Sequence, residues 1–204
     1  ALEVDPALRR QVKADAAATL RLRYEARLKK LAAERVARYV EMGRISLREH
    51  AFVAAANALR IAAALAPDDA EVQALFQEAD LGAAAAMAEQ YLEQARYEEH
   101  QGNFLAAARA YERVLRGRPG AGCHERIAHC RLEAGTDLRA AGEHARRATE
   151  LAPSEPAYRI TLARIYATAG MSQSALAELE RARALSPSDA TIADWIKRVK
   201  RGEP

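Results

Sequence analysis

The sequence predicts an all-α protein, an α-solenoid of about four helix-turn-helix units with elongated first helices and a C-terminal capping helix. Half of the 204 residues are hydrophobic but only 5% are aromatic, and a chain rich in alanine, leucine, arginine and glutamate favours helices over sheets. Similar phrases precede four prolines: Pro67, Pro119, Pro153 and Pro187. The last three recur with a period of about 34 residues, which is typical of stacked helical units.

The phrases before these prolines share an internal spacing. An alanine stands twelve residues before each proline, and a small or medium residue stands five before it: Ala55, Ala107, Ala141 and Ala175, then Ala62, Val114, Ala148 and Ala182. Small residues seven apart leave a smooth strip on a helix, so that a neighbouring helix can approach closely. Glycines that can supply the left-handed backbone of a helix end fall where each first helix should stop: Gly102, Gly135 and Gly170.

This spacing resembles the tetratricopeptide repeat family, whose unit of about 34 residues is a helix, a turn and an antiparallel helix. The resemblance is fullest over residues 156–189, through Leu162, Ala163, Tyr166, Ala175, Leu179, Ala182 and Pro187. It implies four repeats, at residues 36–69, 88–121, 122–155 and 156–187. The third repeat holds one extra residue between Gly135 and Ala141, so its first helix should be one step out of frame.

Residues 1–35 are expected to form a long helical extension. Asp5 can cap the helix, Pro6 suits its first position, and no Gly or Pro interrupts residues 7–42. Residues 1–50 carry a net charge of +5, whereas residues 51–110 carry −6. The apolar side of this helix needs a packing partner, and two interpretations remain. The helix folds back on the acidic second long helix, or a partner or second copy of the chain covers it.

The phrase "LEVDPALRR", Leu2 to Arg10, is similar to the one that closes a J-domain. The His-Pro-Asp triplet that such a domain needs is absent from this sequence. The chain begins at Ala1 without Met, which suits a chain that has been processed or excised. This resemblance implies the repeat region of a J-domain fusion protein, and hence a co-chaperone module.

Residues 70–87 are predicted to be a helical insertion, because a segment of this length makes about five whole turns and would lengthen a helix without rotating its apolar face. One helix over residues 70–101 is expected, with a break near Gly82 as the alternative. At the other end, residues 188–204 should form a capping helix and tail that begins at Ser188. Trp195 in that helix is interpreted as a core anchor.

The sequence shows no motif that would make it an enzyme. It has no glycine-rich phosphate loop, nucleophile elbow or HExxH. In "CHERIAHC", Cys123 to Cys130, the ligand types spread around and along a helix, so we expect no metal site, no disulfide and no cofactor. The other histidines, His50, His100 and His144, are placed at helix ends or on exposed positions.

The repeat resemblance implies a concave groove lined by the first helices, with positions five and nine of each repeat pointing into it. We predict that this groove binds a partner. An apolar residue one turn from a guanidinium suits an extended or helical segment with acidic and apolar side chains. The alternative is that these arginines are only solvated. Position five is Val40, Leu92, Ile160 and Glu125, and position nine is Arg44, Arg96, Arg164 and His129. The family's carboxylate clamp for chaperone tails uses Lys and Asn at these positions, and this chain has neither there.

The expected partner is therefore a protein or peptide, with self-association through the long helices as a further possibility. Nucleic acid is not expected, because aromatic residues for base stacking are few and the acidic middle would repel phosphates. The longest apolar runs are too short to span a bilayer. Two cysteines that do not pair favour the reducing cytoplasm.

Overall fold

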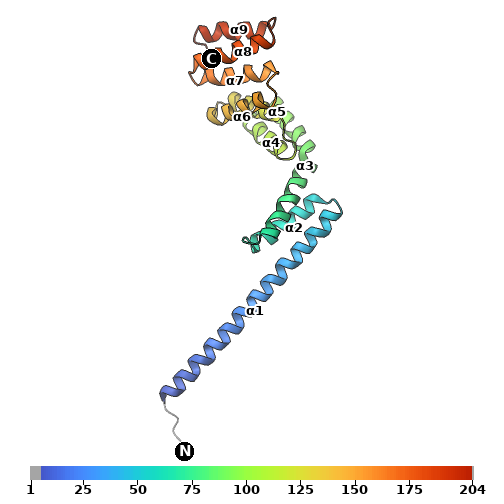
Figure 1. The fold of residues 1–204 in the computed structure, drawn as a ribbon, viewed down its shortest axis with the longest axis vertical. Coiled ribbons are helices and arrows are strands. Elements are labelled where there is room, and N and C mark those ends of the chain that lie inside the picture. The colour runs from blue at the N-terminus through green and yellow to red at the C-terminus, as the bar shows by residue number, and fades with distance from the viewer. Residues whose placement is uncertain (1–5, 204) are drawn as a thin grey trace, which may run out of the picture. The chain divides into compact units, whose positions relative to one another are not determined.

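The computed structural model describes residues 6–203, with side chains from residue 15 onward, and this part of the chain forms nine α-helices (Figure 1). The first residues, including Asp5 and most of the phrase similar to a J-domain, therefore lie outside the described residues. The helices are α1 (Pro6–Arg48), α2 (Phe52–Leu65), α3 (Ala70–His100), α4 (Phe104–Gly117), α5 (Ala121–Glu133), α6 (Leu138–Leu151), α7 (Pro156–Thr168), α8 (Ser172–Leu185) and α9 (Ala190–Lys200).

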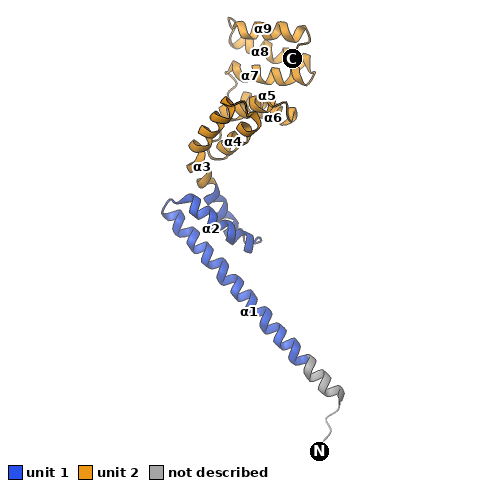
Figure 2. Ribbon diagram, turned by 180° about the vertical axis from the view of Figure 1, so that it is seen from behind, with its two compact units in different colours: residues 1–80 blue, residues 81–204 orange. Residues whose placement is uncertain are grey.

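Two compact units divide the chain at residue 80 (Figure 2). We call residues 1–80 the N-terminal unit and residues 81–204 the C-terminal unit. Helix α3 contributes residues 70–80 to the first unit and residues 81–100 to the second.

The core of the N-terminal unit depends on a close approach of α1 to α2. Leu59 of α2 is fully buried together with Ala55, and Ala79 of α3 packs with them. A Cβ atom at Gly43 of α1 would overlap the side chain of Leu59, so only glycine fits this contact without a shift. Helix α1 continues past Gly43 to Arg48 and ends next to His50, whose φ is +57°.

Within the N-terminal unit, the side chains that the structure describes show no fold-back of the N-terminal extension. Leu20, Tyr24 and Leu31 have exposed fractions of 69%, 64% and 52%. Only from Val36 onward does α1 bury apolar side chains against the rest of its unit. Attraction between the basic and acidic segments does not order long exposed side chains, because water and salt screen it.

Helix α3 is continuous through Gly82, as expected, but its apolar face does not run on unrotated. Val72 and Ala79 are buried in the N-terminal unit, and Ala88 and Ala95 are buried in the C-terminal unit. The step from Ala79 to Ala88 turns the helix by about 180°. The insertion of whole turns therefore does not extend one apolar stripe.

The C-terminal unit is a stack of helix hairpins joined by short turns, with α7, α8 and α9 side by side (Figure 1). The three predicted turn glycines all have positive φ, at +75° for Gly102, +63° for Gly135 and +74° for Gly170. The extra residue of the third repeat lies in the turn after Gly135, where Asp137 is left-handed with φ +45° and caps α6 by accepting from Ala140 N at 3.1 Å.

Helix α9 covers the end of the stack through Ile192, Ile196 and Val199, which pack on α7 and α8. Its N-cap is Asp189, which accepts a hydrogen bond from Thr191 N at 2.8 Å, and not Ser188 as the sequence suggested. Over the described residues, no helix combines the length and the apolarity that crossing a bilayer requires.

Candidate binding pockets

The predicted groove residues divide between the two units. Val40 and Arg44 line a cavity in the N-terminal unit, and Leu92 and Arg96 line one in the C-terminal unit together with Glu125. The remaining three, His129, Ile160 and Arg164, line neither of these cavities.

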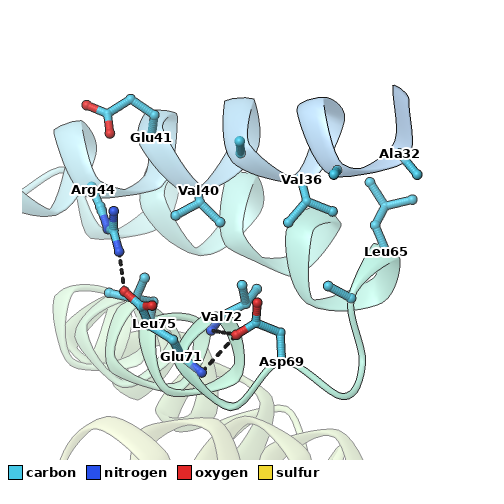
Figure 3. A pocket seen from close by; sticks show the side chains of 13 residues that line it. Ala32, Val36, Val40, Glu41, Arg44, Leu65, Asp69, Glu71, Val72 and Leu75 are labelled. Atoms are coloured by element: carbon cyan, nitrogen blue, oxygen red, sulfur yellow. Dashed lines mark hydrogen bonds and ion pairs between the residues drawn. The ribbon is translucent and has the colours of Figure 1, made fainter. Parts of the chain in front are cut away.

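The N-terminal cavity has a volume of about 720 Å³ and mostly apolar walls (Figure 3). Val36 and Val40 project into it from α1, and Val72 and Leu75 face them from α3. Leu65, at the end of α2, closes one side. This cavity offers apolar contacts along several turns of helix, which suits an aliphatic or aromatic side chain of a ligand.

Charged groups at the rim of this cavity already have partners. Arg44 forms an ion pair with Glu71 of α3. Asp69 caps α3 by accepting from the backbone N–H groups of Glu71 at 3.0 Å and Val72 at 3.2 Å (Figure 3). The guanidinium predicted to grip a ligand carboxylate is therefore occupied by a carboxylate of the protein itself.

The C-terminal cavity has a volume of about 530 Å³ and a more polar lining. Leu92 and Arg96 come from α3, Tyr111 from α4, Glu125 from α5 and Tyr158 from α7. Arg96 is exposed and makes no ion pair within the described part of the chain. The predicted pair of an apolar residue and an unpaired arginine, Leu92 and Arg96, therefore lines this cavity.

Two glutamates in this cavity are held by neighbouring helices. Glu99 accepts a hydrogen bond from Tyr111 Oη at 2.9 Å and pairs with Arg126. Thr161 Oγ1 donates to Glu125 at 3.0 Å. Burial raises the pKa of the Glu125 carboxyl, and this hydrogen bond and the charge of Arg164 oppose the rise.

Arg164 braces the first helices of the C-terminal unit instead of facing a ligand. Its Nη2 lies 2.5 Å from Glu133 Oε1 of α5, and its guanidinium stacks 5.2 Å from the centre of the Trp195 ring. Arg198 lies on the same ring at 4.2 Å. Trp195 is half-buried at this junction, so it is a packing residue that also contacts two cations.

Ile160 and His129 also belong to the packing of the repeats. Ile160 is half-buried against the cluster under α9. His129 lies 3.9 Å from Glu99 and 3.8 Å from Glu133, with its ring edge-on to Phe104. Burial and the charge of Arg126 lower the pKa of His129, so the neutral ring is favoured.

Sequence reasoning missed the contacts that join different helices. Three ion pairs join different helices: Glu133–Arg164, Glu112–Arg131 and Glu178–Arg159. Such contacts leave no periodic signal in the sequence, because the partners are 19 to 31 residues apart.

A histidine pair was missed in the same way. His124 of α5 and His144 of α6 place their Nδ1 atoms 2.9 Å apart, and both rings are half-buried, so His144 does not occupy the exposed position expected of it. At this distance one ring donates and the other accepts, which requires at least one neutral ring. Burial lowers the pKa of both histidines. The charges of His144 and Arg147 lower the pKa of His124 further, and the charge of Arg131 does the same for His144.

Neither cysteine is part of a disulfide, and no group of three or more potential metal ligands occurs among the described residues. Cys130 is fully buried, and burial raises the pKa of its thiol to about 11. Cys123 is half-buried with its Sγ atom 3.8 Å from the carbonyl oxygen of Arg118. The "CHERIAHC" segment is therefore a packed helix face.

Together these features define an all-α protein built of helix hairpins. No protein-family model and no curated protein sequence matches the chain. Among solved structures it is similar to the first TPR of Spaghetti (RPAP3) bound to the HSP90 peptide SRMEEVD, with 14% identity and a TM-score of 0.53 over 57% of this chain and 93% of that one.

Two further structures extend the likeness over most of the chain. MamA matches with 15% identity and a TM-score of 0.52 over 83% of both chains. The TPR2AB domain of yeast Sti1, solved in a complex with pHSP90, matches with 16% identity and a TM-score of 0.52 over 95% of this chain and 81% of that one. The chain thus has the fold of a tetratricopeptide repeat α-solenoid.

Proposed function

We propose that the protein is a non-enzymatic scaffold that binds an acidic and apolar segment of a partner protein at the C-terminal cavity. The observation that carries this proposal is the position of Leu92 and Arg96 at the edge of that cavity, with Arg96 lacking an ion pair in the described part of the chain. A ligand carboxylate can meet the guanidinium in a two-pronged contact. An apolar side chain next to it can pack on Leu92 and Tyr158.

The acids of the cavity limit which ligands fit. Glu99 pairs with Arg126, whereas Glu125 accepts a hydrogen bond from Thr161. A ligand with one carboxylate beside apolar residues is therefore favoured over a strongly acidic one, which would meet Glu125. The peptide SRMEEVD on the TPR of Spaghetti also combines acidic and apolar residues, but its three acidic side chains make it more acidic than the ligand proposed here.

A chaperone tail in the family's clamp mode is a less suitable ligand, because Leu92, Arg96 and Glu125 stand where Lys and Asn would be needed. The co-chaperone module of a J-domain fusion is therefore the second candidate function. We place the scaffold in the cytoplasm, where Cys123 and Cys130 would stay reduced.

A peptide-display library selected on the full chain tests the proposal. We expect the enriched peptides to share one acidic residue flanked by apolar ones, and Arg96→Glu to weaken their binding at least tenfold, measured by fluorescence anisotropy. A tenfold loss corresponds to about 1.4 kcal/mol, a moderate value for a partly exposed charge contact.

Arg109→Glu is the matched control. Arg109 is an exposed arginine of α4 in the same unit and lines a different hollow. The substitution changes the net charge by the same amount, so its binding should stay within about twofold of the original chain. Equal losses for the two variants would mean that only the overall charge matters, and the proposed site would be wrong.

A further inference from the structure

The exposed part of α1 carries an apolar stripe that nothing in its own unit covers. Leu20, Tyr24, Leu28 and Leu31 are all exposed, Leu20 to 69% and Leu28 to 48%. At about 100° per residue these four side chains fall within about 80° around the helix. Leu22 is similarly exposed, at 67%, but points to roughly the opposite side.

This stripe does not continue into the apolar cavity of the N-terminal unit. Each step of four residues turns the helix by about 40°, so Val36 and Val40, which line the cavity, lie about 160° and 200° around the helix from Leu20. Rows with this spacing form the ridges through which helices pack on one another. The row of exposed side chains from Leu20 to Leu31 is about 17 Å long, enough for roughly three turns of a partner helix.

The charge around this row indicates what kind of helix fits. Residues 15–48 hold nine basic and four acidic residues, a net charge of +5. Glu25 and Glu34 are already paired with Arg21 and Lys30 on the same helix. Arg23 and Arg27 flank the row, Arg35 follows one turn after Leu31, and none of the three makes an ion pair in the described part of the chain.

A second copy of the chain is a poor occupant for this surface. Two α1 helices packed through their stripes would bring the basic flanks of both copies together, and like charges at a helix seam oppose pairing. An acidic flank on the partner would instead neutralise the unpaired arginines. The apolar stripe and the basic flanks thus call for an amphipathic helix with the opposite charge.

We propose that α1 binds an amphipathic helix with acidic flanks from another protein, laid along the row from Leu20 to Leu31. The apolar side chains of the partner cover Leu20, Tyr24 and Leu28. Its carboxylates meet Arg27, beside the row, and Arg35, one turn beyond Leu31. This surface belongs to the N-terminal unit, so the inference does not depend on the ligand proposed for Arg96.

The test uses two synthetic helical peptides of about 20 residues, long enough to span the row, with identical leucine positions. Glutamates flank the leucines in one peptide and lysines flank them in the other. We expect the full chain to bind the acidic peptide at least tenfold more tightly than the basic peptide, measured by fluorescence anisotropy. Binding should weaken as salt rises from about 50 to about 300 mM, because salt screens exposed charges. Equal binding of the two peptides would overturn the proposal.

Leu28→Glu and Leu22→Glu form a matched pair, because both leucines are exposed on α1 and both substitutions add one negative charge. Leu28→Glu should reduce binding of the acidic peptide at least tenfold, whereas Leu22→Glu should change it less than threefold. Equal effects of the two variants would place the contact elsewhere and overturn the proposal. Arg96→Glu should leave this binding unchanged, which separates this proposal from the one above.

Two other occupants give distinct results. Light scattering that shows a dimer, dissociated by Leu28→Glu, would assign the stripe to a second copy. Sedimentation with vesicles containing phosphatidylglycerol, dependent on Leu28, combined with no peptide binding, would assign it to a lipid surface. Either result would overturn the proposal.

Discussion

Each unit places an aliphatic residue and an arginine beside a cavity, but only one of the two arginines forms an ion pair within the described part of the chain. In the N-terminal unit Arg44 is paired with Glu71, and the cavity beside Val40 is apolar. In the C-terminal unit Arg96 has no such partner among the described residues, and the cavity beside Leu92 is lined by tyrosines and acids. A repeat position alone therefore does not define a binding residue, because a neighbouring carboxylate decides whether its charge is available.

The largest change in stability is expected from Arg164→Glu, because Arg164 contacts Glu133 of α5 and Trp195 of α9. The new carboxylate would face Glu133 and would remove the stack on Trp195. The side chain is half-buried, so we expect a loss of about 1–3 kcal/mol of stability, between the values for exposed and buried pairs.

Denaturant unfolding of the C-terminal unit, followed by Trp195 fluorescence, measures this loss. Arg96→Glu should change stability by less than about 0.5 kcal/mol, as expected for an exposed residue away from the core. Equal stability of the two variants would show that Arg164 is as available to ligands as Arg96. Because Arg164 is a brace, reversing both arginines together would not separate binding from folding.

A smaller effect concerns the pH dependence of the C-terminal unit. The folded-state pKa of His124 and of His144 lies below the unfolded value, so the unfolded chain binds more protons in this range. The contribution of the pair to stability is therefore present above about pH 6.5 and decreases as the pH falls through the lowered pKa values. The groups facing the pair include Arg147, Arg131, Glu112 and Glu143.

His144→Gln should flatten this decrease between pH 7 and pH 5, by about 1 kcal/mol or less, the size of one neutral hydrogen bond. Unfolding curves of both chains across this range measure the difference. Glu125 acts in the opposite direction, because its folded-state pKa is raised, and it is present in both chains. An unchanged pH slope in the variant would show that the pair does not titrate.

The smallest change in stability is expected from a substitution that makes the N-terminal cavity resemble the C-terminal one. Glu71→Gln removes the ion-pair partner of Arg44 while keeping the shape of the side chain. Both residues are largely exposed, so the stability of the N-terminal unit should change by less than about 1 kcal/mol. The N-terminal cavity should then bind acidic, apolar peptides more tightly, and Glu71→Asp should not show this gain. No gain in Glu71→Gln would mean that the apolar walls alone determine the ligand.

Local patterns predicted the fold well, whereas the site required knowledge of which helices meet. The spacing of alanines, glycines and prolines indicated the tetratricopeptide-like fold, and Gly102, Gly135 and Gly170 have the expected left-handed backbone. The pairing of Arg44 with Glu71 and of Arg164 with Glu133 could not be read from the sequence, because these partners are 27 and 31 residues apart. The unpaired state of Arg96 depends on the same three-dimensional information.

The extra residue of the third repeat also shows where this architecture accepts changes in length. Helix α8 begins two residues after Gly170, and α6 begins three residues after Gly135, with Asp137 taking the left-handed conformation. An added residue inside α6 would instead rotate every later side chain of that helix by about 100°. Insertions in the turns therefore leave the faces of all the helices in register, which gives homologous chains or engineered variants a way to change loop length without repacking the array.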